Sequence, residues 1–246
     1  MHTLPRNHCD SRCIVEGVQP LLTELRETVR GHYRGELDAS RELFEQFIHA
    51  IFQQTYGAKL RSFYPNLVAF TTHGQMRGVV GYRDGMMKPL FSEQYLDEPV
   101  EKLMSAHLDK AVDRRQLVEV GNLALANPGE ARWAIAATTM FLHGAGYRWV
   151  LFTAVKSLFN AFQRLGLNPI QIALPDPKRL PDAGESWGNY YQAGPVVYAG
   201  DIEAGYCKLI THVSQRQPKL KALLDEARYL GIRARLGTAH GVLEAI

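Results

Sequence analysis

The chain has 246 residues, of which 46% are hydrophobic and 22% charged, and its formal net charge is +3. This composition is that of a globular protein with a sizeable core. It excludes a disordered chain, and the mild positive charge does not indicate nucleic-acid binding. The three cysteines are too few for a disulfide framework. Residues 1–17 lack an apolar signal segment, and no run of about 18 apolar residues predicts a transmembrane helix. We therefore expect a cytoplasmic protein with a flexible tail over residues 1–17.

Four segments of the first 110 residues show helical or extended periodicity. In chain order, we expect a weak strand or short helix over 18–30, a helix over 38–57, a β-hairpin of strands 67–72 and 75–82, and a helix from 97 to about 110. Gly57 is expected to cap the first long helix, and His73 and Gly74 to form the hairpin turn. His8, Cys9 and Cys13 in the tail lack a second pair of ligands, so we expect no metal site.

The rest of the chain alternates strands and helices before it ends in helices. The expected elements are strand 117–125, helix 133–145, strand 148–155, helix 157–167, strands 169–174 and 195–199, and helices 201–214 and 218–230, the last stopped by Gly231. This order predicts an α/β (α+β) fold with a mixed, mostly antiparallel central sheet flanked by helices. We expect one catalytic domain over 18–200 and a helical extension over 201–246 packed on or beside it.

The strand 117–125 places a carboxylate among apolar residues. Strict alternation puts Leu117, Glu119, Gly121, Leu123 and Leu125 on one face. A buried carboxylate has a raised pKa unless it is paired, which is the property wanted in a general base. Glu119 is therefore a candidate catalytic residue. The alternative is an ion pair with an arginine such as Arg77 or Arg148.

Gly121 and Asn122 interrupt the branched residues of the same strand. Glycine within a strand often marks a bulge or a close approach of a ligand. A strand that splays here would free a backbone N–H to hold a thioester oxygen as it gains charge, which makes Asn122 a second candidate catalytic residue. The alternative is a glycine that only packs against a large neighbour.

Residues 126–131, Ala-Asn-Pro-Gly-Glu-Ala, resemble the pyrophosphate loop of the GNAT superfamily of N-acetyltransferases. That loop has Arg or Gln, two free positions, Gly, one free position, and Gly or Ala. Gly129 and Ala131 match this pattern, and Ala126 replaces the first residue. As in the superfamily, the loop follows a strand and opens a helix, whose N-terminus attracts phosphates. The resemblance implies a donor site made by Gly121, Asn127, Gly129, Ala131, Arg132 and Asn160.

A second group of residues concerns which side chain could act as the general acid of acyl transfer. Residues 162–167 resemble the Tyr-x-x-x-Gly-Phe helix end of the same superfamily, but Phe162 stands where a tyrosine often acts as general acid. This departure puts the usual acetyl-transfer mechanism in doubt. Trp187, Tyr190 and Tyr191 could line an acyl or acceptor pocket, and a tyrosine hydroxyl there could supply the missing acid. The alternative is a hydrophobic lid over the core.

Several short motifs between residues 40 and 200 resemble the thermostable hemolysin family. They are residues 44–48, 56–58, 63–67, 81–83, 89–97, 119–124, 187–191 and 195–200. The family core is similar to that of GNAT proteins and acyl-homoserine-lactone synthases. The resemblance implies a GNAT-like acyltransferase fold and N-acyl transfer from an acyl-coenzyme A or acyl-carrier-protein thioester to a small-molecule amine or amino acid. Arg83 and Glu93, with Trp187, could then bind the acceptor, or the two charged residues could form a buried ion pair.

Two other functions remain open at this stage. The family name favours a membrane-active hemolysin, against which stands the absence of an export signal and of a spanning segment. A GNAT-like binding module without catalysis is the third hypothesis, favoured by Ala126, Glu130 and Phe162. The basic C-terminal segment around Lys221 and Arg228 could touch a carrier protein or the membrane surface, or be a solvated face.

Overall fold

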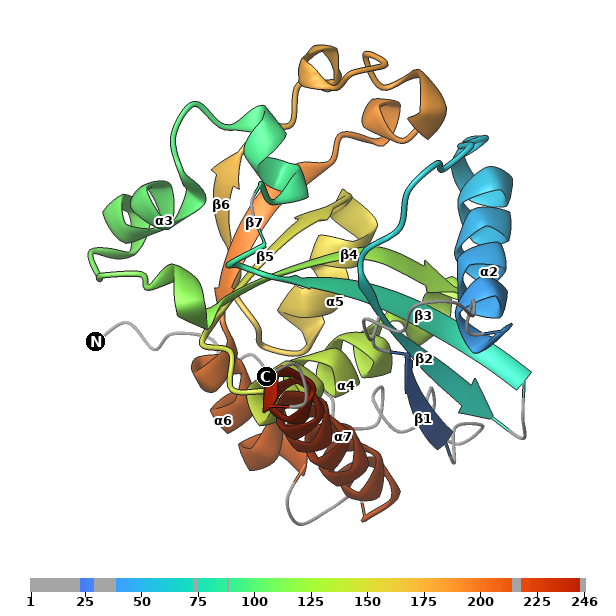
Figure 1. Ribbon diagram of the computed structural model, residues 1–246, viewed down its shortest axis with the longest axis vertical. Helices are drawn as coiled ribbons and strands as arrows, with labels where there is room; N and C mark the ends of the chain where they lie inside the picture. The colour runs from blue at the N-terminus through green and yellow to red at the C-terminus, as the bar shows by residue number, and fades with distance from the viewer. Residues whose placement is uncertain (1–22, 29–38, 73–74, 88, 214–217, 244–246) are drawn as a thin grey trace, which may run out of the picture.

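The computed structural model describes residues 23–28, 39–72, 75–87, 89–213 and 218–243. The expected tail with Cys9 and Cys13, and the turn at His73 and Gly74, lie outside the described residues. Seven strands form one sheet in the order β1-β2-β3-β4-β5-β7-β6, with helices on both of its faces (Figure 1).

Every pair of neighbouring strands in the sheet is antiparallel except β4 and β5, which are parallel. The strands are β1 (Thr23–Thr28), β2 (Asn66–Thr72), β3 (Gln75–Asp84), β4 (Leu117–Leu125), β5 (Trp149–Ala154), β6 (Ile170–Ala173) and β7 (Val196–Asp201). The predicted mixed, mostly antiparallel sheet and its β2–β3 hairpin are confirmed. Of the two interpretations of residues 18–30, the strand is correct for the described residues 23–28, and the rest of that segment lies outside the described residues.

The helices divide between the two faces of the sheet. They are α2 (Ala39–Tyr56), α3 (Val100–Leu108), α4 (Ala131–Gly144), α5 (Lys156–Arg164), α6 (Ile202–Val213) and α7 (Pro218–Leu243), with short 3-10 turns that include η1 (Phe91–Tyr95) and η3 (Pro128–Glu130). One core, which we call the α4 side, joins α4, α5, α6 and α7 to the sheet, and α2, η1 and α3 pack on the other side. In the described part of the chain, no helix combines the length and hydropathy needed to cross a membrane.

A bulge in β4 changes which side chains share a face. Asn122 has a left-handed φ of 50°, and the register of β3 against β4 shifts between Val79 and Gly81. The bulge adds one residue, so the period-two alternation is reversed beyond it. Leu123 therefore lies with Val120 on the α4 side, whereas the residues before the bulge keep their predicted faces. The predicted bulge is confirmed, and the predicted single face from Leu117 to Leu125 is wrong.

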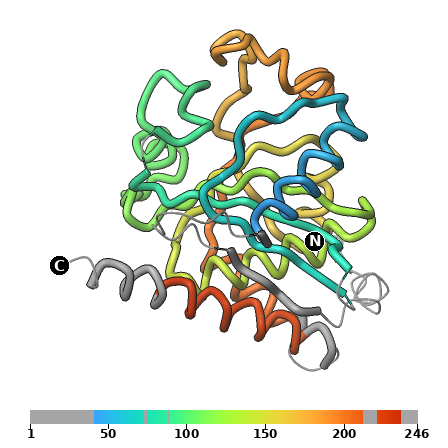
Figure 2. The backbone as a smooth tube through the Cα atoms, turned by 45° about the vertical axis from the view of Figure 1, so that its right-hand side comes forward, coloured from blue at the N-terminus to red at the C-terminus, as the bar shows by residue number. Residues whose placement is uncertain are grey.

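The last helix does not stop where the sequence indicated. α7 runs through Gly231 to Leu243, so the predicted end at Gly231 is wrong. A Cβ on Gly231 would lie 2.0 Å from the Phe141 carbonyl oxygen, and one on Gly144 would lie 2.1 Å from the Arg228 carbonyl oxygen. These glycines let α4 and α7 cross at close range, which Figure 2 shows as α7 lying along α4. Gly57, with a φ of 67°, does end α2 as predicted.

Candidate active site

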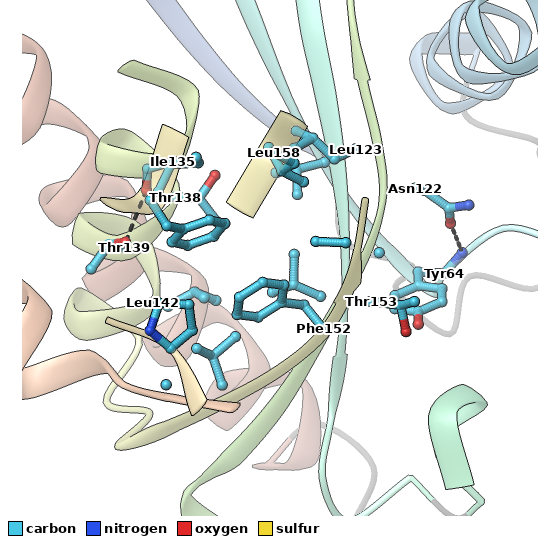
Figure 3. Close-up of a pocket in the computed structure, with 18 of the residues that line it drawn as sticks. Tyr64, Asn122, Leu123, Ile135, Thr138, Thr139, Leu142, Phe152, Thr153 and Leu158 are labelled. Atoms are coloured by element: carbon cyan, nitrogen blue, oxygen red, sulfur yellow. Dashed lines mark hydrogen bonds between the residues drawn. The ribbon is translucent and has the colours of Figure 1, made fainter. Parts of the chain in front are cut away.

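The central feature of the site is a cavity of about 250 Å³ that passes between β4 and β5. The two parallel strands pair only as far as Val120 and Phe152, although β4 continues to Leu125 and β5 to Ala154. Beyond that pair the strands separate, as the sequence predicted for Gly121. The opening connects the two faces of the sheet, and Figure 3 shows Phe152 and Leu158 on one side of it and Tyr64 and Thr153 on the other.

The half of the cavity on the α4 side is mainly apolar, with the hydroxyl-bearing Thr138 and Thr139 among its lining. Its lining includes Ile135, Leu142, Val150, Phe152, Leu158 and Phe162. The rings of Phe152 and Phe162 stack with centroids 4.7 Å apart, so Phe162 serves as an apolar wall. At its far end the cavity reaches exposed residues of α6, among them Lys208, whose ammonium donates to the Gly166 carbonyl at 2.9 Å. An alkyl chain would bind favourably in this half, because its apolar surface would leave water and contact apolar side chains.

On the opposite face, Glu119 is completely buried beside the cavity. Its carboxylate accepts the backbone N–H of Phe91 at 2.7 Å and that of Ser92 at 2.6 Å. Burial raises the pKa of Glu119 above its ordinary value, although hydrogen bonds from Ser92 and Phe91 and the charge of Arg83 act in the opposite direction. The raised pKa predicted from sequence is therefore confirmed.

The ion pairs considered for Glu119 are made by other residues. Arg77 pairs with the buried Glu130, and Arg148 pairs with Asp201 at 2.8 Å. Among the described residues, no cation lies within 4 Å of the Glu119 carboxylate. The predicted alternative of an Arg77 or Arg148 partner is thus wrong, because both arginines are neutralised elsewhere.

Tyr64 is the site residue that sequence reasoning missed. It packs closely on two glycines, since a Cβ on Gly121 would come within 2.7 Å of its ring and one on Gly81 within 2.8 Å of its Cβ. Its backbone N–H donates to Asn122 Oδ1 at 2.8 Å. The large neighbour that was the alternative explanation of Gly121 is therefore Tyr64. Gly121 was the sequence signal for it, but a glycine does not identify the ring that covers it.

The phenol of Tyr64 interacts with Glu119. Burial, the Glu119 charge and a hydrogen bond to that carboxylate raise the pKa of Tyr64 well above its ordinary value, whereas the charge of Arg83 lowers it. The Arg83 guanidinium lies 5.0 Å from the centre of the Tyr64 ring and donates to the Pro89 carbonyl at 3.1 Å. Arg83 and Tyr64 both line the cavity. The structure thus brings together Glu119, Asn122, Arg83 and Tyr64.

Glu93 lies in η1 but is engaged in a different interaction. The Arg114 guanidinium binds it in a bidentate fashion at 2.6 and 2.8 Å, and these contacts lower the pKa of Glu93 to about 2 against the opposing effect of burial. The cavity lining does not include Glu93. The buried ion pair that was the alternative interpretation of Glu93 is present, with Arg114 as its partner, and a role in substrate binding stays a prediction.

Aromatic side chains surround the mouth of the cavity on the Glu119 side. We call this group the aromatic cluster; it consists of Phe52, Tyr56, Phe91, Tyr95, Trp187 and Tyr190, all of which line the cavity. The Trp187 ring lies 5.5 Å from that of Phe91 and 5.3 Å from that of Tyr190. Tyr191 is outside the lining, and its hydroxyl hydrogen-bonds that of Tyr95. Burial raises the pKa of Tyr190, and that of Tyr191 to about 12.

The residues predicted to hold phosphates lie outside the cavity lining: Asn127, Gly129, Ala131, Arg132 and Asn160. The N–H of Gly129 donates to Asn127 Oδ1 at 3.0 Å, and that of Ala131 to the Pro128 carbonyl. The loop therefore caps itself at the start of α4, with the Arg77–Glu130 pair beneath it. Asn160 is exposed on α5. Their role in donor binding stays a prediction.

The chain resembles known proteins in both sequence and fold. The family described as thermostable hemolysin matches residues 35–206. No curated protein matches the chain. Among solved structures, FeeM, an N-acyl amino acid synthase from uncultured soil microbes, is 14% identical with a TM-score of 0.51, and the match covers 77% of this chain and 95% of FeeM. A CoA-dependent acyl-homoserine lactone synthase, BjaI, with SAM and isopentyl-CoA, is also 14% identical, with a TM-score of 0.49 and coverage of 83% and 89%. The expected fold, a mixed and mostly antiparallel sheet flanked by helices, is confirmed and is shared with FeeM.

Proposed function

This chain belongs to the thermostable hemolysin family, and we propose that it transfers an acyl group from a pantetheine thioester to a small-molecule amine. The observation that carries the proposal is the cavity through the split between β4 and β5. It joins an apolar half, suited to an alkyl chain, to a half that contains a buried carboxylate, a tyrosine and an arginine. Transfer between two substrates that approach from opposite faces of a sheet requires such a passage.

In this proposal the acyl chain lies between Phe152, Phe162 and Ile135 on the α4 side. The thioester carbonyl lies at the split, where the backbone of Gly121 and Asn122 no longer pairs with β5 and is positioned to polarise it. The phosphate end of the donor lies toward the start of α4. Because the Gly129 amide is already used by Asn127, the charge of Arg132 makes the main contact there.

The acceptor amine enters through the aromatic cluster. Arg83, which keeps guanidinium N–H groups beyond the one bonded to Pro89, would bind a carboxylate or another anionic group of the acceptor. Glu119, whose pKa is raised by burial, accepts the amine proton as the amine attacks the thioester. FeeM makes an N-acyl amino acid, and this supports an amino acid as one acceptor to test.

Thermal unfolding in the presence of decanoyl coenzyme A tests the donor site. A ligand that binds only the native state raises the melting temperature, by an amount that grows with the ratio of its concentration to Kd. We expect such a rise with the thioester, and a new N-acyl product by mass spectrometry when the common amino acids and simple amines are added. If no acyl thioester raises the melting temperature and the purified protein lyses red cells alone, the acyltransferase proposal is wrong.

A single variant can test whether the nucleotide phosphates of a coenzyme A donor bind at the start of α4. Replacing Arg132 with Glu should weaken binding of coenzyme A thioesters if the donor phosphates lie beside it, with little effect on a short acyl-pantetheine that lacks the nucleotide. If wild type and variant bind the coenzyme A thioester equally well, and likewise the acyl-pantetheine, the start of α4 is not part of the donor site.

A further inference from the structure

We propose that Tyr64 is the group that touches the acceptor amine and that it relays the amine proton to Glu119. This rests on the proposed acyl transfer and adds a catalytic residue that the GNAT resemblance does not supply. Phe162 stands where the superfamily often has its tyrosine, and Tyr64 comes from a different part of the chain, the irregular segment between α2 and β2.

Tyr64 and Glu119 differ in their exposure to the cavity. Glu119 has no exposed surface and is not part of the cavity lining, whereas the Tyr64 ring and the neighbouring Asn122 line it. A substrate in the cavity therefore meets the phenol before the carboxylate. A Cβ on Gly121, which shares the Glu119 face of β4, would lie 2.9 Å from the Tyr64 hydroxyl oxygen. The phenol therefore lies beside the buried base, and the charge of Glu119 acts on it.

The position of Tyr64 is fixed from three directions. Gly81 and Gly121 leave room for its Cβ and its ring, and Asn122 accepts its backbone N–H. Arg83 lies over the ring face, a cation–π arrangement that opposes displacement of the ring. A side chain held by strands β3 and β4 together satisfies the requirement of general acid–base catalysis for precise placement.

The charged and titratable groups around the phenol together disfavour its ionised form, the phenolate. Glu119 and Tyr95 act to keep the Tyr64 proton in place, and Arg83 acts in the opposite direction. A relay in which the phenol accepts one proton as it releases another needs no stable phenolate, so the raised pKa does not prevent it.

The transfer step balances as follows. The acceptor enters as the neutral amine, its extra proton having gone to water, and its nitrogen attacks the thioester carbon. The amine proton moves to the Tyr64 oxygen while the Tyr64 proton moves to Glu119. When the C–S bond breaks, Glu119 returns its proton to Tyr64, which protonates the departing thiolate. One C–N bond forms, one C–S bond breaks, and the enzyme ends in its starting state.

A second hydroxyl route reaches the same carboxylate. Thr153 lines the cavity, and its hydroxyl lies 3.5 Å from that of Ser92, whose own hydroxyl and amide contact Glu119. The tyrosine is favoured because its hydroxyl lies over Gly121, beside Glu119 on the same face of β4, whereas the threonine reaches Glu119 only through Ser92. Thr153→Val, which removes only the second route, is therefore the direct competitor in the test.

The experiment compares Tyr64→Phe, Glu119→Gln and their double variant with Tyr229→Phe, a matched change at an exposed tyrosine on α7. Tyr64→Phe keeps the ring that packs on Gly121, so we expect an unchanged thermal response to decanoyl coenzyme A. Its kcat for amine acylation should fall about 10²–10⁴-fold. The double variant should be no slower than the slower single variant, because both changes interrupt one relay.

A nucleophile that needs no base supplies a second readout. Hydroxylamine is largely unprotonated at neutral pH and attacks thioesters directly, so the loss in Tyr64→Phe should shrink when it replaces the amine. The inference is overturned if Tyr64→Phe keeps kcat within about twofold of wild type, if the losses of the two single variants multiply, or if Thr153→Val shows the large loss instead. If wild type neither binds nor cleaves decanoyl coenzyme A, the acyltransferase proposal itself fails, which the thermal response reports separately.

Discussion

Glu93 and Glu119 are both mostly buried, and both accept backbone N–H groups from the turn at residues 90–92. Glu93 also receives a bidentate guanidinium from Arg114, and its pKa falls to about 2. Glu119 receives no cation within 4 Å among the described residues, and burial raises its pKa. The same type of side chain beside one turn thus has a lowered pKa where an arginine pairs with it and a raised pKa where no arginine of the described chain does.

The comparison shows that burial alone does not identify a functional carboxylate. Arg114 is itself buried, donates to the Gly85 carbonyl and also pairs with Glu101 at 2.7 Å, so it links the turn after β3 to η1 and α3. Glu119 lies at the point where the sheet opens. The two carboxylates differ in pKa because Glu93 has an arginine partner and Glu119 has none in the part of the chain that the structure describes.

The largest expected effect comes from removing the unpaired carboxylate. Glu119→Gln should lower the rate of acyl transfer about 10²–10⁴-fold, because an amide cannot accept the relayed proton. Initial rates with decanoyl coenzyme A and the best acceptor measure this. Full activity in a folded Glu119→Gln protein would mean that Glu119, like Glu93, is structural.

Removing the cation from the paired carboxylate should act on stability. Arg114→Met leaves Glu93 and Glu101 without their partner, and breaking a buried pair in this way costs about 3–5 kcal/mol. Urea unfolding measures the loss, while kcat per folded molecule should stay close to wild type. A destabilisation below about 1 kcal/mol would show that Arg114 contributes no more than a surface ion pair.

The two carboxylates should give pH dependences of opposite sign. Glu93 has a lowered pKa, so the stability it contributes is present above about pH 4.5 and is lost as pH falls toward about 2. Glu119 has a raised pKa, so its contribution falls as pH rises through that pKa. Unfolding free energies of Glu93→Gln and Glu119→Gln, each relative to wild type, should therefore change with pH in opposite directions. Parallel curves would contradict the comparison.

The smallest effect is expected from Ser92→Ala. The Ser92 hydroxyl lowers the pKa of Glu119, so its removal should move the acidic limb of the pH–rate profile upward by up to about one pH unit. Thr71→Ser, a hydroxyl-conserving change on β2 away from the cavity lining, serves as a control for general perturbation. An unshifted or downward-shifted limb would remove Ser92 from the charge environment of Glu119.

Local patterns in the sequence predicted the parts of the molecule that depend on local rules. The apolar face of α2, the β2–β3 hairpin and the β4–α4–β5–α5 order follow from periodicity and caps. Gly231 was misread because a glycine that ends a helix and one that lets two helices cross are the same residue in a sequence. The decisive neighbour, Phe141, is far away in the chain.

The candidate site was predictable only in part for a related reason. Glu119 is recognisable because a carboxylate in an apolar strand is unusual wherever the strand lies. Tyr64 is in a segment without regular structure, and its position depends on Gly81, Gly121 and Asn122 of two later strands. The loop 126–131 resembles a pyrophosphate-binding pattern. Only the folded chain shows that the Gly129 amide already donates to Asn127 Oδ1.

The crossing of α4 and α7 affects how the chain folds as it leaves the ribosome. Leu223, Leu224 and Ala227 of α7 fill the core over α4, and α7 also contacts β1 near the other end of the described chain. The surfaces of α4 and β1 that α7 covers therefore stay exposed until α7 has been synthesised. Closing such distant contacts costs loop entropy and slows folding. A nascent chain paused before Pro218 would expose these surfaces and would be a natural client for chaperones that bind apolar segments.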